Sequence, residues 1–270
     1  MKSILLTTDF SDNARNALDY AIGVFGIDAN YTLLNTFVEP SSTTSVMVSI
    51  IEFLQKESKE GLLKQKGALE EAFPGLNLSL QSQYGDLAVV INKMSDAAHF
   101  DYAVIGTKGA SAVENFFIGS NTLNVVKTVK MALLVIPENS KYTGLNKIAL
   151  AADFQPTDES ELMKPLTYLA KAKDSELLIV NVRSGEGGAN YDEAMEGFEL
   201  HNVLEGVQHS FYSKEHDDVV AGIEEFVKEE KADVLAMIAR KHTFFERLFN
   251  KSITKQISML ADIPLLILHE

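Results

Sequence analysis

The sequence contains no cysteine among its 270 residues. Disulfide bonds and thiolate metal sites are therefore excluded, and nothing in the composition points to an oxidising compartment. Long apolar runs are also missing, because the longest (131–136 and 263–268) are far shorter than the roughly 20 residues of a membrane-spanning helix. The chain begins directly with a predicted strand and shows no signal-peptide pattern, so we expect a cytoplasmic protein.

Positive charge is scarce. The 24 Lys and Arg residues against 38 Asp and Glu residues give a formal net charge of -14. This charge argues against a general nucleic-acid or anionic-membrane binder, because phosphate groups attract cations. One basic cluster is the local exception: Arg240, Lys241, Arg247, Lys251 and Lys255. It is either a solvated surface that balances nearby acids (Glu224, Glu225, Glu229 and Glu230) or an anion or partner site, and we favour the solvated surface.

The common chemical fingerprints are absent as well. Neither a P-loop nor G-x-G-x-x-G occurs in the sequence. The histidines show no metal-ligand spacing, so surface or structural roles are expected for all six: His99, His201, His209, His216, His242 and His269. We therefore predict no catalytic residue and no metal ligand.

The sequence does contain an internal repeat. The run KSILLTTDF (2–10) returns as NKIALAADF (146–154), YTLLNTF (31–37) as ELLIVNV (176–182), and MALLVIPE (131–138) as DIPLLILHE (262–270). Self-similarity at this period predicts tandem copies of one fold. Each half has the length of an ordinary domain, and we place the two domains at 1–140 and 141–270.

Strands and helices alternate within each copy. In the first, strand-like runs at 4–8, 31–38, 76–83, 102–106 and 133–136 are separated by helical patterns. Strands rich in Val, Ile and Leu that are joined by helices predict an α/β fold, with a parallel sheet covered by helices on both faces. The second copy has a shorter segment before its third strand. Its first helix contains Pro165, which predicts a late start or a kink.

A glycine constellation follows the fourth strand of the first copy. Gly106 and Gly109 are followed, after nine residues, by Gly119, Ser120, Asn121 and Thr122 at the start of a helix. Glycines allow backbone to approach a ligand, and a helix N-terminus offers unpaired N–H groups to phosphate. The alternative is that these glycines only shape a turn and start a helix. On spacing alone, that alternative is favoured.

The spacing G-x2-G-x9-G-S, taken with the order of elements, resembles the universal stress protein family over both copies. The resemblance implies two Rossmann-like (adenine nucleotide alpha hydrolase-like) domains, each a five-stranded parallel sheet of order 3-2-1-4-5. Many members bind ATP and others bind no nucleotide. ATP is the expected ligand, with ADP or AMP as alternatives, and Mg²⁺ would accompany it.

Carried over position by position, the resemblance places Asp9 against the nucleoside and the backbone of Thr36 against the adenine. It places the following residues around the phosphates and ribose: Gly106, Gly109, Gly119, Ser120, Asn121 and Thr122. The chain departs from the family pattern at Asn35, where His is usual, and at Lys108, where Arg is common. Asp9 and Asp12 are candidates to approach Mg²⁺, although Asp12 fits a helix cap better.

Topology supports this placement independently of the resemblance. In a sheet of order 3-2-1-4-5, the chain reverses direction between strands one and four, and a crevice opens at their carboxyl ends. Asp9 and Gly106 close those two strands. Asp9 also has an alternative role as a helix-capping carboxylate, and both roles stay open.

The second copy lacks the glycines. Aligned on the fourth strand, Gly106 to Gly109 correspond to Ala239-Arg240-Lys241-His242, and the following loop is one residue shorter before Ser252. Side chains at these positions would fill the space left for phosphates, although Asp153 persists. We therefore expect one nucleotide per chain.

These inferences predict a stress-response protein that binds a nucleotide for regulation or sensing, without fast catalysis. A ligand-free interaction module and a slow ATPase are the alternatives. The terminal strands (133–136 and 265–268) are apolar edges that invite pairing. The family pairs such strands between domains, which implies an internal pseudo-dimer of the two copies, and we also expect a homodimer of the chain.

Overall fold

The computed structural model describes residues 1–39, 47–108, 119–152, 160–183, 200–240 and 263–269. Gly109, Asp153, Lys241, His242 and Ser252, which the sequence singled out, lie outside the described residues. The chain divides into two compact units, Met1–Lys141 and Tyr142–Glu270. No helix among the described residues is long and apolar enough to cross a membrane.

The first unit is built on five parallel strands. They are β1 (Ser3–Thr7), β2 (Asn30–Phe37), β3 (Asn77–Tyr84), β4 (Tyr102–Gly106) and β5 (Leu133–Ile136). Their order is β3-β2-β1-β4-β5, with every neighbouring pair parallel. The chain therefore changes direction between β1 and β4, where a ligand crevice is expected in folds of this type.

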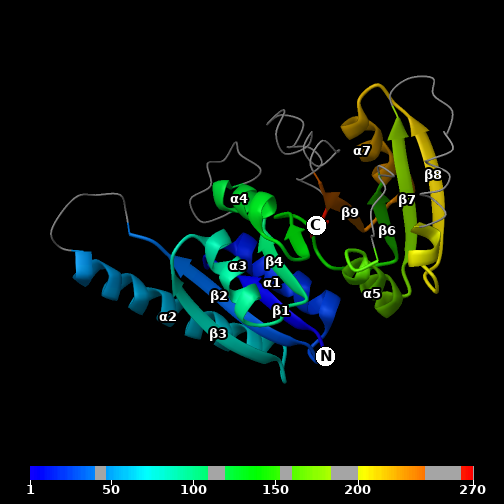
Figure 1. Ribbon diagram of the computed structural model, residues 1–270. Helices are drawn as coiled ribbons and strands as arrows, with labels where there is room; N and C mark the ends of the chain where they lie inside the picture. The colour runs from blue at the N-terminus through cyan, green and yellow to red at the C-terminus, as the bar shows by residue number, and fades with distance from the viewer. Residues whose placement is uncertain (40–46, 109–118, 153–159, 184–199, 241–262, 270) are drawn as a thin grey trace. The chain divides into compact units, whose positions relative to one another are not determined.

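Four helices cover this sheet (Figure 1): α1 (Asp12–Phe25), α2 (Met47–Ala72), α3 (Leu87–Ala97) and α4 (Ser120–Thr128). Helix α1 packs on β1, β4 and β5, and α2 on β2 and β3. Arg15 of α1 reaches the carbonyl of Ala68 in α2, so these two helices share one face. Right-handed crossovers place α3 and α4, which pack together, on the other face.

The helix starts follow from local chemistry. Ser11 caps α1 with its Oγ, which accepts from the Ala14 N–H at 3.1 Å. Asp86 caps α3 and accepts from the N–H groups of Ala88 and Val89. Helix α4 differs, because its N-cap is Gly119 and no side chain caps it. Its first-turn N–H groups are therefore not satisfied by a capping side chain.

The second unit repeats the strand arrangement. Its strands are β6 (Lys147–Ala151), β7 (Glu176–Arg183), β8 (His209–Glu215), β9 (Val234–Ala239) and β10 (Leu265–His269). Within this unit the order is β10-β9-β6-β7-β8, and all neighbouring pairs are parallel. Counted from the start of the unit, this is the order of the first unit, and the predicted α/β class is confirmed.

Two helices of this unit are α5 (Lys164–Lys173) and α7 (Val219–Glu230). Pro165 stands in the first turn of α5, where its missing N–H costs no helical hydrogen bond. The prediction of a late start is confirmed, since α1 begins three residues after Asp9 whereas α5 begins eleven residues after Asp153. The end of α5 is fixed by Asp174 in a left-handed conformation.

The asparagine shared by the two copies has the same structural role in both units. Asn35 Nδ2 donates to the Thr8 carbonyl at 2.8 Å, and Asn181 Nδ2 donates to the Ala152 carbonyl at 3.0 Å. Each asparagine thus satisfies a backbone acceptor immediately after the central strand ends. Its presence reflects this structural need, which holds whether or not a unit binds a ligand.

His269 makes the second unit sensitive to acid. It ends β10, and burial lowers its pKa from 6.5 to about 4. Above pH 6.5 both the folded and the unfolded states hold it neutral. As pH falls, the unfolded state takes up a proton first, so stability decreases between pH 6.5 and about 4.

We expect His269→Gln to remove this component. The wild type should lose about 1–2 kcal/mol of unfolding free energy from this group between pH 7 and pH 5, and the variant should lose correspondingly less. Urea unfolding of both proteins at the two pH values measures the difference. Equal acid sensitivity in the two proteins would show that His269 titrates normally in the fold.

Candidate functional site

The carboxyl ends of β1, β2 and β4 bring together three of the predicted residues. Asp9 follows β1, Thr36 lies one residue before the end of β2, and Gly106 is the last residue of β4. The strand order places β1 between β2 and β4. These residues therefore meet at one edge of the sheet, as the topology predicted.

Asp9 belongs to a tight turn between β1 and α1. Its Oδ1 accepts from both the N–H and the hydroxyl of Ser11, at 3.1 and 2.6 Å. Phe10 has a φ of 68°, which is unusual for a residue with a side chain, and its N–H donates to Thr8 Oγ1. Asp9 is exposed and supports the helix cap, so the turn fixes its carboxylate just beyond the carboxyl end of β1.

The position of the Phe10 ring also explains why residue 61 of α2 is a glycine. A Cβ built on Gly61 would lie 2.5 Å from the Phe10 ring, so the ring occupies the space that a side chain there would need. The turn that holds Asp9 is thereby fastened to α2. The positive φ of Phe10 is a backbone strain, and backbone strain is often retained at functional sites.

The backbone of Thr36 points toward the end of β1. The Thr8 N–H donates to the Leu34 carbonyl at 2.9 Å, so the backbone groups of Leu34 face β1. Alternate residues in a strand direct their N–H and C=O to the same side, so those of Thr36 also face that side. Since β1 ends at Thr7, it offers Thr36 no ladder partner. These groups suit an edge-on contact with a planar ligand.

The beginning of α4 is tied to the end of β4. The Gly119 N–H donates to the Thr107 carbonyl at 2.8 Å, and Thr122 Oγ1 donates to the Gly106 carbonyl at 2.9 Å. Gly119 and Thr122 therefore connect the start of α4 to the end of β4. The N–H of Gly119 and the hydroxyl of Thr122 already donate to acceptors within the protein. Ser120 and Asn121 are exposed in the first turn of α4, a helix whose N-cap makes no side-chain hydrogen bond.

Asn13 of α1 is the residue that sequence reasoning missed. Its side chain is 6% exposed, and its Oδ1 accepts from the Lys108 N–H at 3.0 Å. Its Nδ2 is buried and has no hydrogen-bond partner among the described residues. Leaving a buried donor unpaired costs about 1–3 kcal/mol, so the exception needs an explanation. The sequence did carry a signal for Asn13: a polar residue stands one helical turn before Ala17, on the face of α1 that is otherwise apolar and buried.

The position of Asn13 also explains why residue 106 is a glycine. A Cβ on Gly106 would lie 2.1 Å from Asn13 Oδ1 and 3.2 Å from the Asn13 carbonyl oxygen. The absence of a side chain at Gly106 lets α1 approach the end of β4. In the structure this motif glycine makes room for Asn13, which in turn holds the peptide of Lys108.

Lys108 has a carboxylate partner. Its Nζ lies 2.5 Å from Glu138 Oε2, just after β5. Lys108 stands at a position where Arg is common in the family pattern. In this structure its ammonium group would have to leave Glu138 to contact a phosphate.

The second unit shows that the predicted alignment of the copies was wrong by one residue. Asp101 receives the Ser3 N–H and donates its own N–H to the Ser3 carbonyl, and Asp233 does the same with Lys147. Counting five residues on from each aspartate, Gly106 corresponds to Ile238, not to Ala239. The distance in sequence from Gly106 to Ser120 then equals that from Ile238 to Ser252, so the predicted shorter loop disappears.

With the corrected alignment, the second copy still has no glycine at the position of Gly106. Ile238 is buried where Gly106 stands in the first unit, and Arg240, also buried, replaces Lys108. A branched side chain thus stands at the strand end where the first unit has a glycine packed against Asn13. The short spacer between strand and loop was misaligned because both copies place small and basic residues there.

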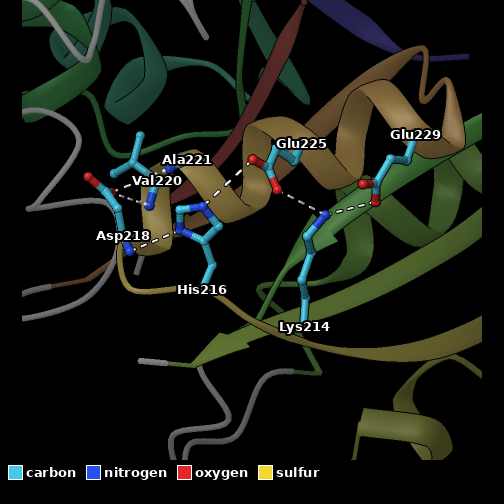
Figure 2. A network of polar contacts seen from close by, with 7 residues as sticks. All are labelled: Lys214, His216, Asp218, Val220, Ala221, Glu225 and Glu229. Carbon is cyan, nitrogen blue, oxygen red and sulfur yellow. Dashed lines mark hydrogen bonds and ion pairs between the residues drawn. The ribbon is translucent and has the colours of Figure 1, made fainter. Parts of the chain in front are cut away.

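The four glutamates named together with the basic cluster all have lysine partners. Figure 2 shows Lys214 of β8 between Glu225 and Glu229 of α7, at 3.4 and 2.8 Å. These contacts raise the pKa of Lys214, chiefly through the hydrogen bond to Glu229. Elsewhere Lys228 pairs with Glu224, and Lys147 pairs with Glu230.

His216 joins the same network (Figure 2). Its Nδ1 accepts from the Asp218 N–H at 2.9 Å, so its proton is on Nε2, which lies 3.6 Å from Glu225. Asp218 caps α7 through Val220 and Ala221. The two ring nitrogens of His216 thus contact Asp218 and Glu225, and these contacts connect α7 to the end of β8.

These features define an α/β protein with repeated domains, in the first of which the chain changes direction between β1 and β4. The model of the universal stress protein family matches residues 1–137 and again residues 144–269. The chain therefore belongs to the universal stress protein family and contains two copies of the family domain in tandem.

Individual relatives agree with this assignment. A universal stress protein from Archaeoglobus fulgidus has a similar solved structure, with a TM-score of 0.74, 19% identity, and coverage of 99% of this chain and 96% of that one. A functionally unknown protein from Pseudomonas aeruginosa has a TM-score of 0.59 at 14% identity, covering 100% and 92% of the two chains. A Staphylococcus epidermidis protein named for the same family is 27% identical over 159 residues, which are 57% of this chain and 90% of that protein.

Proposed function

We propose that the first unit binds an adenine nucleotide, ATP or the related ADP or AMP, as a regulatory or sensing event. The observation that carries this proposal is the buried, unpaired Asn13 Nδ2 beside Gly106 and Lys108. A hydrogen-bond donor in that position needs an acceptor, and a phosphate oxygen supplies one.

The surrounding groups fit the parts of a nucleotide. The backbone of Thr36 is directed past the end of β1 and suits the polar edge of adenine. The uncapped first turn of α4, at Ser120 and Asn121, suits a phosphate. Asp9 stands exposed beside them and suits the ribose hydroxyls or, with Asp12, a Mg²⁺ ion carried by ATP.

The second unit is not proposed as a nucleotide site. Ile238 fills the position of Gly106, and Arg240 is buried in the position of Lys108. We also propose a cytoplasmic location, which the absence of cysteine from the sequence fits.

Binding without fast turnover is the favoured form of the function. A phosphotransferase also needs a group that orients or deprotonates the nucleophile. Asp9 already accepts two hydrogen bonds from Ser11, which suits a fixed structural carboxylate better than a base. A slow ATPase stays the alternative.

Mass spectrometry of small molecules released from freshly purified protein tests the proposal. We expect an adenine nucleotide, and titration of the stripped protein with ATP and Mg²⁺ should restore binding. If the released fraction contains no nucleotide and the stripped protein binds none, the first unit is a ligand-free interaction module.

We also propose that β5 and β10 pair with each other, which gives an internal pseudo-dimer, and that the chain forms a homodimer. Both strands are apolar, and Leu134 and Leu266 are buried. Unpaired edges of this kind are avoided in soluble proteins.

The double variant Leu134→Asp, Leu266→Asp should expose a protease site near Lys141 or cause aggregation. Leu78→Asp, on β3, introduces a buried charge without touching either strand and serves as the control. Limited proteolysis and light scattering provide the readout. Protection of Lys141 in the double variant, or identical behaviour of the control, would argue against the pairing.

A further inference from the structure

Asn16 of α1 holds the connecting segment (137–141), which follows β5 and ends the first unit. Its side chain is buried, and its Oδ1 accepts from Lys141 Nζ at 2.6 Å. Its Nδ2 donates to three carbonyl oxygens of the segment, at 3.1, 3.2 and 2.9 Å: those of Pro137, Glu138 and Ser140. The segment belongs to no helix or strand, so this one asparagine supplies much of its support.

The connecting segment also contacts the proposed nucleotide site. Glu138 Oε2 lies 2.5 Å from Lys108 Nζ, and the Lys108 N–H donates to Asn13 Oδ1 at 3.0 Å. Asn13 and Asn16 stand one helical turn apart at the start of α1, and both side chains are buried. The same helix start therefore supports the proposed phosphate position and the segment that leads into the second unit.

The ion pair between Lys108 and Glu138 is weak enough to be exchanged. The two side chains are 25% and 49% exposed, and an ion pair in contact with water contributes little to stability. The lysine side chain is long and flexible, so its ammonium group can move while its N–H stays on Asn13. A triphosphate carries more negative charge than one carboxylate and offers several acceptor oxygens. A phosphate beside Asn13 would therefore attract the ammonium group away from Glu138.

We propose that Glu138 competes with the phosphates of the bound nucleotide for Lys108, and that this exchange couples nucleotide binding to the connecting segment. The coupling rests on the nucleotide site proposed above for the first unit. When a phosphate takes Lys108, the segment loses one of the contacts that hold it to that unit. Coupling is reciprocal, so removing Glu138 from Lys108 strengthens phosphate binding by the factor by which phosphate weakens the hold on the segment.

Calorimetric titration of the stripped full chain with ATP and Mg²⁺, and separately with adenosine, tests the competition. Glu138→Gln should bind ATP about two- to fivefold more tightly, the factor that corresponds to an exposed ion pair. Adenosine has no phosphate, so both proteins should bind it equally. In a Lys108→Gln background, Glu138→Gln should change the ATP affinity little, whereas simple repulsion between Glu138 and phosphate would keep the gain.

The matched control is Glu70→Gln. Glu70 pairs with Lys66 at 3.2 Å and is 44% exposed, so the variant removes the same charge from a similar ion pair. It lies near the end of α2, which leads into the start of β3, at the opposite end of the sheet from the site. Its ATP affinity should equal that of the wild type.

Hydrogen exchange followed by mass spectrometry tests the effect on the connecting segment. Saturating ATP should speed exchange of the amides of residues 138–141 about two- to fivefold in the wild type. Glu138→Gln should exchange at the faster rate with or without ATP. If the wild type binds ATP but Glu138→Gln binds it no more tightly, or if ATP leaves the exchange of the segment unchanged, the coupling is wrong and the nucleotide site stands. If the stripped protein binds no ATP, the proposed function fails and the coupling fails with it.

Discussion

Gly106→Ala is expected to destabilise the first unit by about 1–3 kcal/mol, the usual cost of overpacking. The new Cβ would lie 2.1 Å from Asn13 Oδ1, far inside van der Waals contact. Asn13 cannot move away freely, because the same oxygen accepts the Lys108 N–H. Urea unfolding of wild type and variant measures the change.

Gly67→Ala is the matched control. Gly67 lies inside α2, and a Cβ there would meet nothing within 4 Å. Alanine at this position should therefore stabilise the helix by about 0.5–1 kcal/mol. In a double-mutant cycle, Asn13→Ala should reduce the cost of Gly106→Ala. A neutral Gly106→Ala, or additive costs in the cycle, would refute the packing explanation of this glycine.

Asn13→Asp should weaken ATP binding by at least about tenfold. The aspartate keeps an oxygen for the Lys108 N–H but replaces the unpaired Nδ2 donor by a second acceptor. It also adds a negative charge beside the proposed phosphate position, where like charges repel. Adenosine has no phosphate, so its binding should change little. Calorimetric titration with both ligands separates the two effects.

The control for added charge is Asn77→Asp. Asn77 begins β3, at the opposite end of the sheet from the site, and is exposed. Its variant should bind ATP as the wild type does. If Asn13→Asp also binds ATP with unchanged affinity, the unpaired donor does not face the phosphates.

Much of the fold could be predicted from the sequence because the signals were local and repeated. The Val, Ile and Leu runs, the polar turns between them and the recurrence of each run identified parallel strands and two copies. Pro165 predicted the late start of α5, since proline lacks an N–H and is tolerated only in the first turn. Such effects act within a few residues of the chain.

The role of individual site residues depended on distant contacts. Nothing next to Gly106 in sequence indicated that Asn13, far earlier in the chain, would press against it. The resemblance places Gly119 and Thr122 around the phosphates and ribose, which stays a prediction, and the structure adds that both donate hydrogen bonds to the end of β4. The one-residue error that paired Gly106 with Ala239 became visible in the structure, where the bonds of Asp101 and Asp233 and the pairing of the strands fix the register.

The number of nucleotides bound by each chain tests the central claim most directly. Calorimetric titration of the stripped, full-length protein with ATP and Mg²⁺ should give one site per chain, and Asn13→Asp should weaken that site. Two equivalent sites would contradict the assignment of Ile238 and Arg240 as residues that close the second unit. A single site unaffected by Asn13→Asp would place the nucleotide elsewhere.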